Sequence, residues 1–254
     1  MGLLQGKIGI VTGAGRGIGR ATALLAAREG AAVTVAELKE SRGRETVSAI
    51  EAAGGRAHFV QVDVRHREQV EAMVAETVEV FGGLDWASNN AAGRMAYGHV
   101  TEIEPEAWQE ALDVMLTGVW LCMRAEIPAM LASGGGAIVN IASMLAISGA
   151  PMMAAYAAAK GGVVSLTRSA AAEYALDGIR VNAVNPGLVD TPGSRRTLSA
   201  DLERATSAMA MDRLGRPEEI AEAVVWLCSD RSSFATGECL AIDGGIQVKL
   251  PTYP

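Results

Sequence analysis

Short apolar runs alternate along this chain with longer stretches in which apolar residues recur at helical spacing. Such alternation is typical of βαβ units built around a parallel sheet. The pattern predicts strands at 7–12, 31–36, 57–62, 84–89, 136–142, 179–184 and 239–242. It predicts helices at 17–29, 40–53, 67–81, 105–132, 152–176 and 217–229. Right-handed crossovers would then place helices on both faces of the sheet and bring the carboxyl ends of the strands to one rim.

A loop rich in glycine follows the first predicted strand. Residues 12–19 read Thr-Gly-Ala-Gly-Arg-Gly-Ile-Gly, and a helical pattern begins directly after them. Glycines permit a tight turn and let backbone N–H groups approach a pyrophosphate, which the positive end of a helix attracts. One glycine triplet is weak evidence by itself. The strand before it, the helix after it and the acidic Glu37 about 20 positions on together predict a dinucleotide site.

Three polar residues predict the chemistry. Ser143 follows the fifth predicted strand, and Tyr156 and Lys160 lie four apart in a predicted helix. Residues at this spacing share one helix face, so we expect the Lys160 ammonium beside the Tyr156 phenol, where it would lower the phenol pKa. The tyrosine could then exchange a proton with an alcohol or carbonyl while Ser143 orients the substrate oxygen. Tyr-x-x-x-Lys alone is usually a surface pair, but here it accompanies the glycine loop.

The order of these motifs resembles that of the single-domain short-chain dehydrogenases/reductases over nearly the whole chain. Three further segments match, each after a predicted strand: Asp63-Val64, Asn89-Asn90-Ala91-Ala92-Gly93 and Asn185-Pro186-Gly187-Leu188-Val189-Asp190-Thr191. The resemblance implies an α/β, doubly wound Rossmann fold with a seven-stranded parallel sheet and helices on both faces. It implies one domain over residues 1–254, with a substrate lid at approximately 188–213. It also implies a homotetramer or homodimer assembled through the two long helices.

Roles for individual residues follow from the same resemblance. Ser143, Tyr156 and Lys160 would be catalytic, and Lys160 would also bind the nicotinamide ribose. The segment at Asp63 would contact the adenine, and Asn90 would lie along a ribose. The expected cofactor-binding set is Gly13, Arg16, Gly17, Ile18, Gly19, Glu37, Asp63, Val64, Asn90, Tyr156, Lys160, Pro186, Gly187, Val189 and Thr191, of which the last two would hold the nicotinamide carboxamide.

Two residues indicate different cofactors. Glu37 ends the second predicted strand, where a carboxylate can accept hydrogen bonds from the adenosine ribose and would repel a 2′-phosphate. Arg16, inside the glycine loop, could pair with such a phosphate or with Glu37 itself. We give Glu37 more weight and expect NAD.

The chain departs from the family pattern at two positions. Met115 stands where relatives usually carry an asparagine that holds a proton-relaying water, and a thioether cannot replace the amide hydrogen bonds. Ala92 stands where a glycine is usual and adds a methyl group near the nicotinamide pocket. Our hypothesis is a weakened but working site. The relay could instead run through backbone groups and another water, the enzyme could be slow, or the residue could have been altered deliberately.

Composition narrows the classes of partner. The chain has 254 residues, 50% hydrophobic content and 20% charge, enough to bury one large core. Its net charge of -7 argues against nucleic acid or an anionic membrane as partner. Three cysteines without framework spacing fit a reducing cytoplasm, and three scattered histidines support no metal site. Residues 127–159 carry no charge, but glycines and Pro151 interrupt them, so we expect no membrane span.

The expected function is an NAD(H)-dependent oxidoreductase that interconverts a secondary alcohol and a ketone, with Tyr156 as general acid/base. The substrate should be small and mostly apolar, because the loops near 94–99, 144–153 and 188–211 are mostly apolar. An NADPH-dependent 3-oxoacyl-carrier-protein reductase is the nearest alternative, although Glu37 and the lack of a basic patch weigh against it. A non-catalytic NAD-binding sensor or scaffold is an alternative of another class, with Met115 as its best support.

Overall fold

A seven-stranded parallel sheet forms the centre of the protein. The structure is a computed structural model that describes residues 2–198 and 202–249. Within these residues the strand order is β3-β2-β1-β4-β5-β6-β7, and every neighbouring pair is parallel. The strands are β1 (Ile8–Thr12), β2 (Ala32–Glu37), β3 (Arg56–Gln61), β4 (Trp86–Asn89), β5 (Gly136–Ile141), β6 (Ile179–Pro186) and β7 (Cys239–Ile242). All seven predicted strands and the doubly wound α/β fold are confirmed, and the strand order reverses between β1 and β4.

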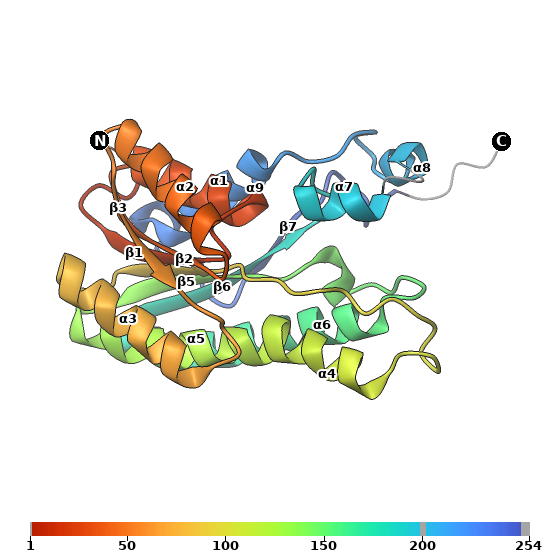
Figure 1. Cartoon of the computed structure of the whole chain (residues 1–254), viewed down its shortest axis with the longest axis horizontal. Coiled ribbons are helices and arrows are strands. Elements are labelled where there is room, and N and C mark those ends of the chain that lie inside the picture. Colours follow the sequence, from red (N-terminus) through yellow and green to blue (C-terminus); the bar gives the residue numbers. More distant parts are fainter. Residues whose placement is uncertain (1, 199–201, 250–254) are drawn as a thin grey trace.

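Helices cover both faces of the sheet, as predicted (Figure 1). One layer contains α1 (Gly17–Arg28), α2 (Glu40–Ala52) and α9 (Pro217–Cys228). The other contains α3 (Arg67–Phe81), α4 (Pro105–Leu112), α5 (Gly118–Ala132) and α6 (Ala154–Tyr174). Short 3-10 turns lie at η2 (Met144–Ala146), η3 (Ala175–Asp177) and η4 (Asp230–Ser232).

Alternate strand residues supply two separate cores. Ile10 and Ile138 join the core beneath α3, α5 and α6, whereas Val11 and Val139 join the core beneath α1 and α9. Because both faces are covered, successive strand residues are apolar, and the runs lack the polar alternation of a half-exposed sheet. This burial holds the strand ends, and the loops that follow them, in fixed positions.

The predicted helix at 105–132 is interrupted. A π-helical turn, η1 (Asp113–Thr117), separates α4 from α5 and contains the fully buried Met115. A Cβ on Gly118, where α5 begins, would lie 2.8 Å from Cγ2 of Val64, so the glycine lets the helix approach the loop after β3. Single π turns inside helices occur frequently at functional sites.

The same stretch, Pro105–Ala132, is long and apolar enough to cross a membrane by length and composition, because its most apolar 18-residue window has a mean hydropathy of 1.4. Half of its most apolar window is buried inside the protein, as in the core helix of a globular fold. Length and hydropathy are therefore weak evidence for a membrane span here.

Two helices were not predicted. α7 (Pro192–Leu198) and α8 (Leu202–Ser207) lie within the expected lid, on the same side of the sheet as α9 (Figure 1). Both are short and mostly polar, so they carry no apolar periodicity. Residues 199–201 of the expected lid lie outside the described residues.

Candidate active site

The glycine loop is fastened to the end of β4. The Asn90 backbone N–H donates to Oγ1 of Thr12 at 2.9 Å, and its Nδ2 donates to the Thr12 carbonyl at 3.1 Å and the Gly13 carbonyl at 3.3 Å. A Cβ on Gly19 would lie 2.4 Å from Asn90 Nδ2, so that position requires glycine. Asn90 therefore holds the glycine loop in place through hydrogen bonds to its backbone. Contact of Asn90 with a ribose stays a prediction.

The loop and the start of α1 fit a pyrophosphate. Gly13 and Gly17 have φ angles of 63° and 55°, a left-handed conformation that favours glycine. Arg16 occupies the N-cap position of α1 and makes no capping hydrogen bond with its exposed side chain. The side chain of Arg16 therefore accepts no hydrogen bond from the first N–H groups of α1. These N–H groups can donate to an anion instead. Ile18 packs into the core beneath α1 and anchors this end of the helix.

The segment after β6 lies next to the glycine loop, at the same rim of the sheet. Pro186 ends the strand, and a Cβ on Gly187 would lie 2.6 Å from the Asp243 carbonyl oxygen. Val189 is buried, and Thr191 lies so close to the loop that a Cβ on Gly17 would be 3.2 Å from its Cγ2. The structure therefore brings the segment predicted to hold the carboxamide next to the segment predicted to hold the pyrophosphate.

Glu37 presents a fixed carboxylate at the end of β2. Its side chain is buried, its Oε2 accepts a hydrogen bond from the Gly15 N–H at 3.0 Å, and its Oε1 accepts one from the Lys39 N–H at 3.0 Å. A Cβ on Gly15 would lie 2.8 Å from Glu37 Oε2, so glycine permits this approach. Both oxygens are bound by backbone N–H groups, and Arg16 is exposed.

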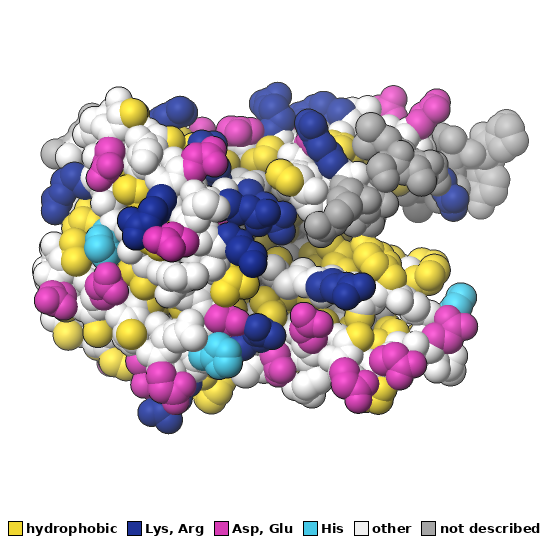
Figure 2. Space-filling model, viewed as in Figure 1, with side chains coloured by type: hydrophobic (Ala, Val, Ile, Leu, Met, Phe, Trp, Pro, Cys, Tyr) yellow, Lys and Arg dark blue, Asp and Glu magenta, His cyan; other side chains and the backbone are white. Residues whose placement is uncertain are grey.

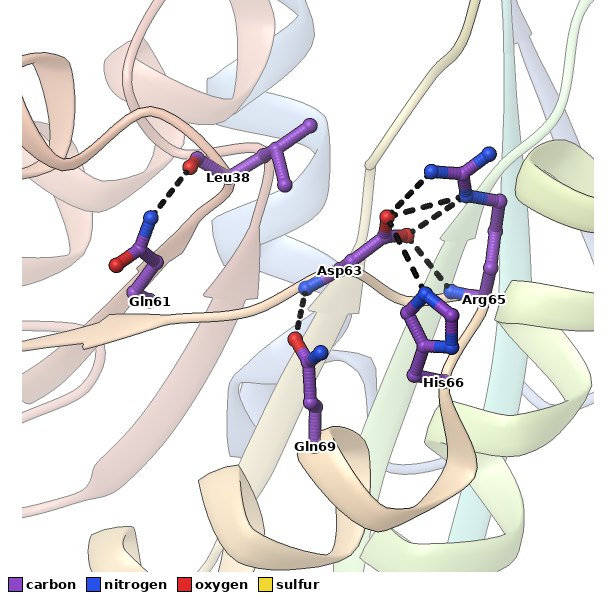
Figure 3. Close-up of polar contacts among 6 residues, drawn as sticks. All are labelled: Leu38, Gln61, Asp63, Arg65, His66 and Gln69. Carbon is purple, nitrogen blue, oxygen red and sulfur yellow. Dashed lines mark hydrogen bonds and ion pairs between the residues drawn. The ribbon is translucent and has the colours of Figure 1, made fainter.

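Asp63 lies at the end of β3 in a network of its own (Figure 3). Its carboxylate accepts hydrogen bonds from Arg65 Nη2 at 2.6 Å and Nε at 3.0 Å, and its N–H donates to Gln69 Oε1 at 2.8 Å. The Arg65 hydrogen bond lowers the pKa of Asp63, so the carboxylate is ionised at neutral pH. The neighbouring Val64 is buried against Gly118. Contact of either residue with an adenine stays a prediction.

Ser143, Tyr156 and Lys160 meet where β5 faces α6. Ser143 is buried just after β5, and its Oγ accepts a hydrogen bond from the Leu145 N–H at 3.1 Å. Lys160 is 3% exposed, and its Nζ donates to the Ile141 carbonyl at 2.6 Å, which joins the helix to the strand. That Nζ lies 5.9 Å from the centre of the Tyr156 ring. Burial lowers the pKa of Lys160 to about 8, so the side chain remains protonated at neutral pH.

The pKa of Tyr156 differs from the expectation. Burial raises it, and a hydrogen bond with Ser143 opposes the rise only in part. The sequence predicts a lowered pKa, whereas enclosure of the phenol gives a raised one, although the Lys160 ammonium lies 5.9 Å from the ring centre. The phenol is therefore protonated at neutral pH, which suits a proton donor.

Met115 lies beneath the same helix. Its side chain is fully buried in a small cluster with Ala155 and Ala159 of α6, and the Tyr156 ring packs against that cluster. The thioether thus fills apolar space close to the catalytic helix and offers no amide to a water. Ala92, the second departure from the family pattern, is exposed.

A hollow with hydrophobic side chains opens at the surface of the molecule (Figure 2). Figure 2 shows a hollow between the side of the molecule that carries α7 and the layer of α4 and α6, with hydrophobic side chains along its wall. Exposed apolar residues in the loops expected to bind substrate include Ile147, Met152 and Met211. The Gly98 N–H donates to the Met152 carbonyl at 3.2 Å and ties two of these loops together.

Sequence reasoning missed two residues near the site. Tyr97 lies close enough to contribute to the raised pKa of Tyr156, although the sequence pattern indicates only its loop at 94–99. Glu126 is fully buried on α5 and accepts a hydrogen bond at Oε2 from Asn89 Nδ2 at 3.0 Å. A lone carboxylate within the apolar run of α5 was the signal that could have identified it. Among the described residues no cluster of metal-ligating side chains occurs.

The burial of Lys160 predicts a cost in stability. Its pKa of about 8 in the folded protein lies below the ordinary value of 10.5, so the unfolded chain binds the proton more tightly and stability rises with pH between these values. We expect Lys160→Met to raise the free energy of unfolding by about 1–2 kcal/mol at neutral pH, and by less at about pH 10. Urea denaturation at both pH values measures this. Lys39→Met, at an exposed position, is the matched control, and a destabilised Lys160→Met would contradict the prediction.

Comparison with known proteins places this geometry in a family. A family model described as "Enoyl-(Acyl carrier protein) reductase" matches residues 13–247. The 2,5-dichloro-2,5-cyclohexadiene-1,4-diol dehydrogenase of Sphingobium indicum is 45% identical over 246 residues, which cover 95% of this chain and 97% of that protein. The cyclohexanol dehydrogenase of an Acinetobacter species is 41% identical over 96% of each chain.

A solved structure agrees with these relatives. It is described as a putative NAD(P)-dependent gluconate 5-dehydrogenase from Beutenbergia cavernae with NADP bound at low occupancy. It matches with a TM-score of 0.91 at 38% sequence identity and covers 97% of this chain and 98% of its own. The chain therefore belongs to the short-chain dehydrogenase/reductase family of oxidoreductases.

Proposed function

We propose that this protein is an NAD(H)-dependent dehydrogenase that interconverts a secondary alcohol and a ketone on a small, largely apolar substrate. The observation that carries the proposal is the meeting of Ser143, Tyr156 and Lys160 between β5 and α6. A cyclic alcohol is the class that we favour, because relatives named for a cyclohexadiene diol and for cyclohexanol are both more than 40% identical.

In the proposed mechanism each catalytic side chain has one task. Ser143 donates a hydrogen bond to the substrate oxygen, and Tyr156 exchanges a proton with that oxygen. Lys160 holds a positive charge behind the Tyr156 ring and keeps α6 attached to β5. A bound nicotinamide would supply the acceptor or donor of hydride at the substrate carbon. Because burial raises the pKa of Tyr156, donation to a ketone suits neutral pH, whereas alcohol oxidation needs the phenol proton removed first.

NAD is the cofactor that we propose in preference to NADP. The carboxylate of Glu37 is held by two backbone N–H groups at the end of β2, where a 2′-phosphate would meet a fixed negative charge. The glycine loop and Thr191 would hold the pyrophosphate and the nicotinamide end. The exposed Arg16 is the feature that would favour NADP.

We also propose a homodimer or homotetramer that forms through α5 and α6. These helices carry the exposed Trp120 and Leu131 and border a groove of about 330 Å³ lined by Ile127, Leu166 and Tyr174. Burial of such an apolar surface favours association. We further propose a single catalytic domain over residues 1–254, with a substrate lid at approximately 188–213. The proposed location is the cytoplasm, and we propose neither nucleic acid nor membrane as a partner.

Reduction of an acyl-carrier-protein substrate is the second candidate. The description of the matching family model favours it. The net charge of -7 weighs against it, because a carrier protein is itself acidic and like charges repel. A non-catalytic NAD-binding sensor is the third candidate, and the loss of the usual amide at Met115 is its support.

Turnover tests the proposed activity directly. Reduced-cofactor absorbance is followed with cyclic and acyclic secondary alcohols, their ketones and a 3-oxoacyl thioester, with NAD and NADP tested separately. We expect oxidation of cyclic alcohols with NAD that becomes faster as pH rises, because the raised pKa of Tyr156 limits its use as a base. Tyr156→Phe should lower turnover by at least about a hundredfold. Thioester reduction with NADPH alone would support the second candidate, and NAD binding without turnover would support the sensor.

Cofactor preference should depend on Glu37. We expect Glu37→Gln to lower kcat/KM for NAD about tenfold and to raise it for NADP by a similar factor, because the charge that binds the ribose and repels a phosphate is lost. Steady-state kinetics with both cofactors measures the change. Glu40→Gln, at an exposed position three residues on, is the control. An unchanged NAD-to-NADP ratio in Glu37→Gln would reject the assignment of selectivity to this carboxylate.

Residue 115 tests the proton relay. We expect Met115→Asn to raise turnover, because an amide beneath α6 could hold a water that exchanges protons with Lys160. The buried amide should also lower the free energy of unfolding by about 1–3 kcal/mol. Met115→Leu, which keeps the volume and stays apolar, should retain the original turnover. A folded Met115→Asn protein with unchanged turnover would show that the relay does not limit the reaction.

A further inference from the structure

A chain of buried polar side chains crosses the protein just beneath the rim. Glu126 on α5, Asn89 on β4, Asn140 on β5 and Thr167 on α6 are each at most 2% exposed. Asn89 Nδ2 donates to Glu126 Oε2 and to Asn140 Oδ1, both at 3.0 Å. Asn140 Nδ2 donates in turn to Thr167 Oγ1 at 3.0 Å. Four elements that build the site are therefore joined through one network.

Two acceptors of this network have no hydrogen-bond donor among the residues that the structure describes. Glu126 Oε1 and Asn89 Oδ1 are both buried acceptors without a hydrogen-bond partner in the structure. Nδ2 of Asn89 already donates to two acceptors, so it has no further proton to offer. An ionised Glu126 only accepts, whereas a protonated one gains an O–H donor. A proton on Glu126 is the smallest change that gives the pair the missing donor.

The surroundings of Glu126 also favour the neutral acid. Burial raises its pKa to about 7, and the Asn89 hydrogen bond offsets this only partly. The titratable groups nearby are the thiols of Cys122 on α5 and Cys228 on α9, whose own pKa values burial raises, so both are neutral. The group of α6 that bonds to the network is the uncharged hydroxyl of Thr167.

The charged groups of the neighbouring elements bond to partners other than Glu126. Lys160, also on α6, is bonded to the Ile141 carbonyl. On the side of α3, Glu71 and Arg124 form an ion pair at the surface, with 45% and 42% of their side chains exposed. These partners leave the carboxylate of Glu126 without a neutralising cation among the described residues.

The network ends at the groups that place the catalytic residues. Asn89 precedes Asn90, which holds the glycine loop. Asn140 precedes Ile141, whose carbonyl binds Lys160. The network therefore reaches the ends of β4 and β5, which hold the glycine loop and bind the catalytic lysine of α6.

We propose that Glu126 is a positioning residue that works as a neutral carboxylic acid, which completes the network with Asn89 and Asn140, and that loss of its proton as pH rises weakens the active-site rim. The kinetic part of this inference rests on the proposed function, whereas the protonation part does not. Glu126→Gln is the informative variant, because its amide offers a carbonyl acceptor and N–H donors at every pH and so imitates the protonated acid.

The first experiment measures unfolding temperature and infrared absorption against pH. The folded pKa of about 7 lies above the ordinary value of 4.5, so the stability that this proton contributes is present at low pH and is lost as pH rises through about 7. From about pH 5.5 to 8.5 we expect the unfolding temperature of the original protein to fall by about 5 °C relative to Glu126→Gln. Over the same range a carboxylic-acid carbonyl band should disappear in the original protein and be absent from the variant.

Exposed Glu79→Gln is the control and should follow the original protein throughout. Parallel unfolding curves for the original protein and Glu126→Gln, or no acid band at low pH, would overturn the inference. Such a result would mean that Glu126 is ionised in the folded protein.

The second experiment compares kcat/KM against pH. The ratio of the original protein to Glu126→Gln should fall about threefold from about pH 6 to pH 8, while Glu126→Ala stays low at every pH because Asn89 loses its acceptor. A role in folding alone would leave the pH profiles of the original protein and Glu126→Gln parallel, and would overturn the positioning role. If neither protein turns over any alcohol, the proposed function fails, and the unfolding and infrared results still decide the protonation of Glu126.

Discussion

The hydrogen bond from Lys160 to the Ile141 carbonyl is the contact on which the arrangement of the site depends. It joins α6, the longest helix among the described residues, to strand β5, and thereby fixes Tyr156 relative to Ser143. The ammonium group of a buried lysine needs a strong acceptor, and a strand-end carbonyl supplies one. The same burial that lowers the pKa of the lysine raises that of the tyrosine, so one enclosed volume sets the protonation of both groups.

The rim around this contact is preformed by the chain itself. Asn90 holds the glycine loop, Gly15 and Lys39 hold the carboxylate of Glu37, and Arg65 holds Asp63. A ligand that meets such a site has fewer groups to order, and less conformational entropy is lost on binding. Specificity then depends on which groups are fixed before the ligand arrives.

Much of this architecture was predictable from the sequence, because its signals are local. The apolar runs identified all seven strands, and the glycine loop identified the dinucleotide rim. Helical spacing placed Tyr156 and Lys160 on one face, but it could not tell that the ammonium would bond to Ile141, which is distant in the sequence. The polar α7 and α8 carry no apolar stripe, and the burial of Glu126 becomes visible only when four elements pack together.

The π turn at Asp113–Thr117 has a consequence for how this chain could have diverged. A π turn contains one residue more than an α-helical turn, and each α-helical residue rotates the chain by about 100°. The wider π turn takes up this extra residue, so removal of a single residue there would restore a continuous α-helix while the side chains of α4 keep nearly the same direction relative to α5. A deletion of one residue, which would misalign the faces of a regular helix, is therefore compatible with the packing of this segment. The π turn thus separates the length of the helix from the packing of its two halves.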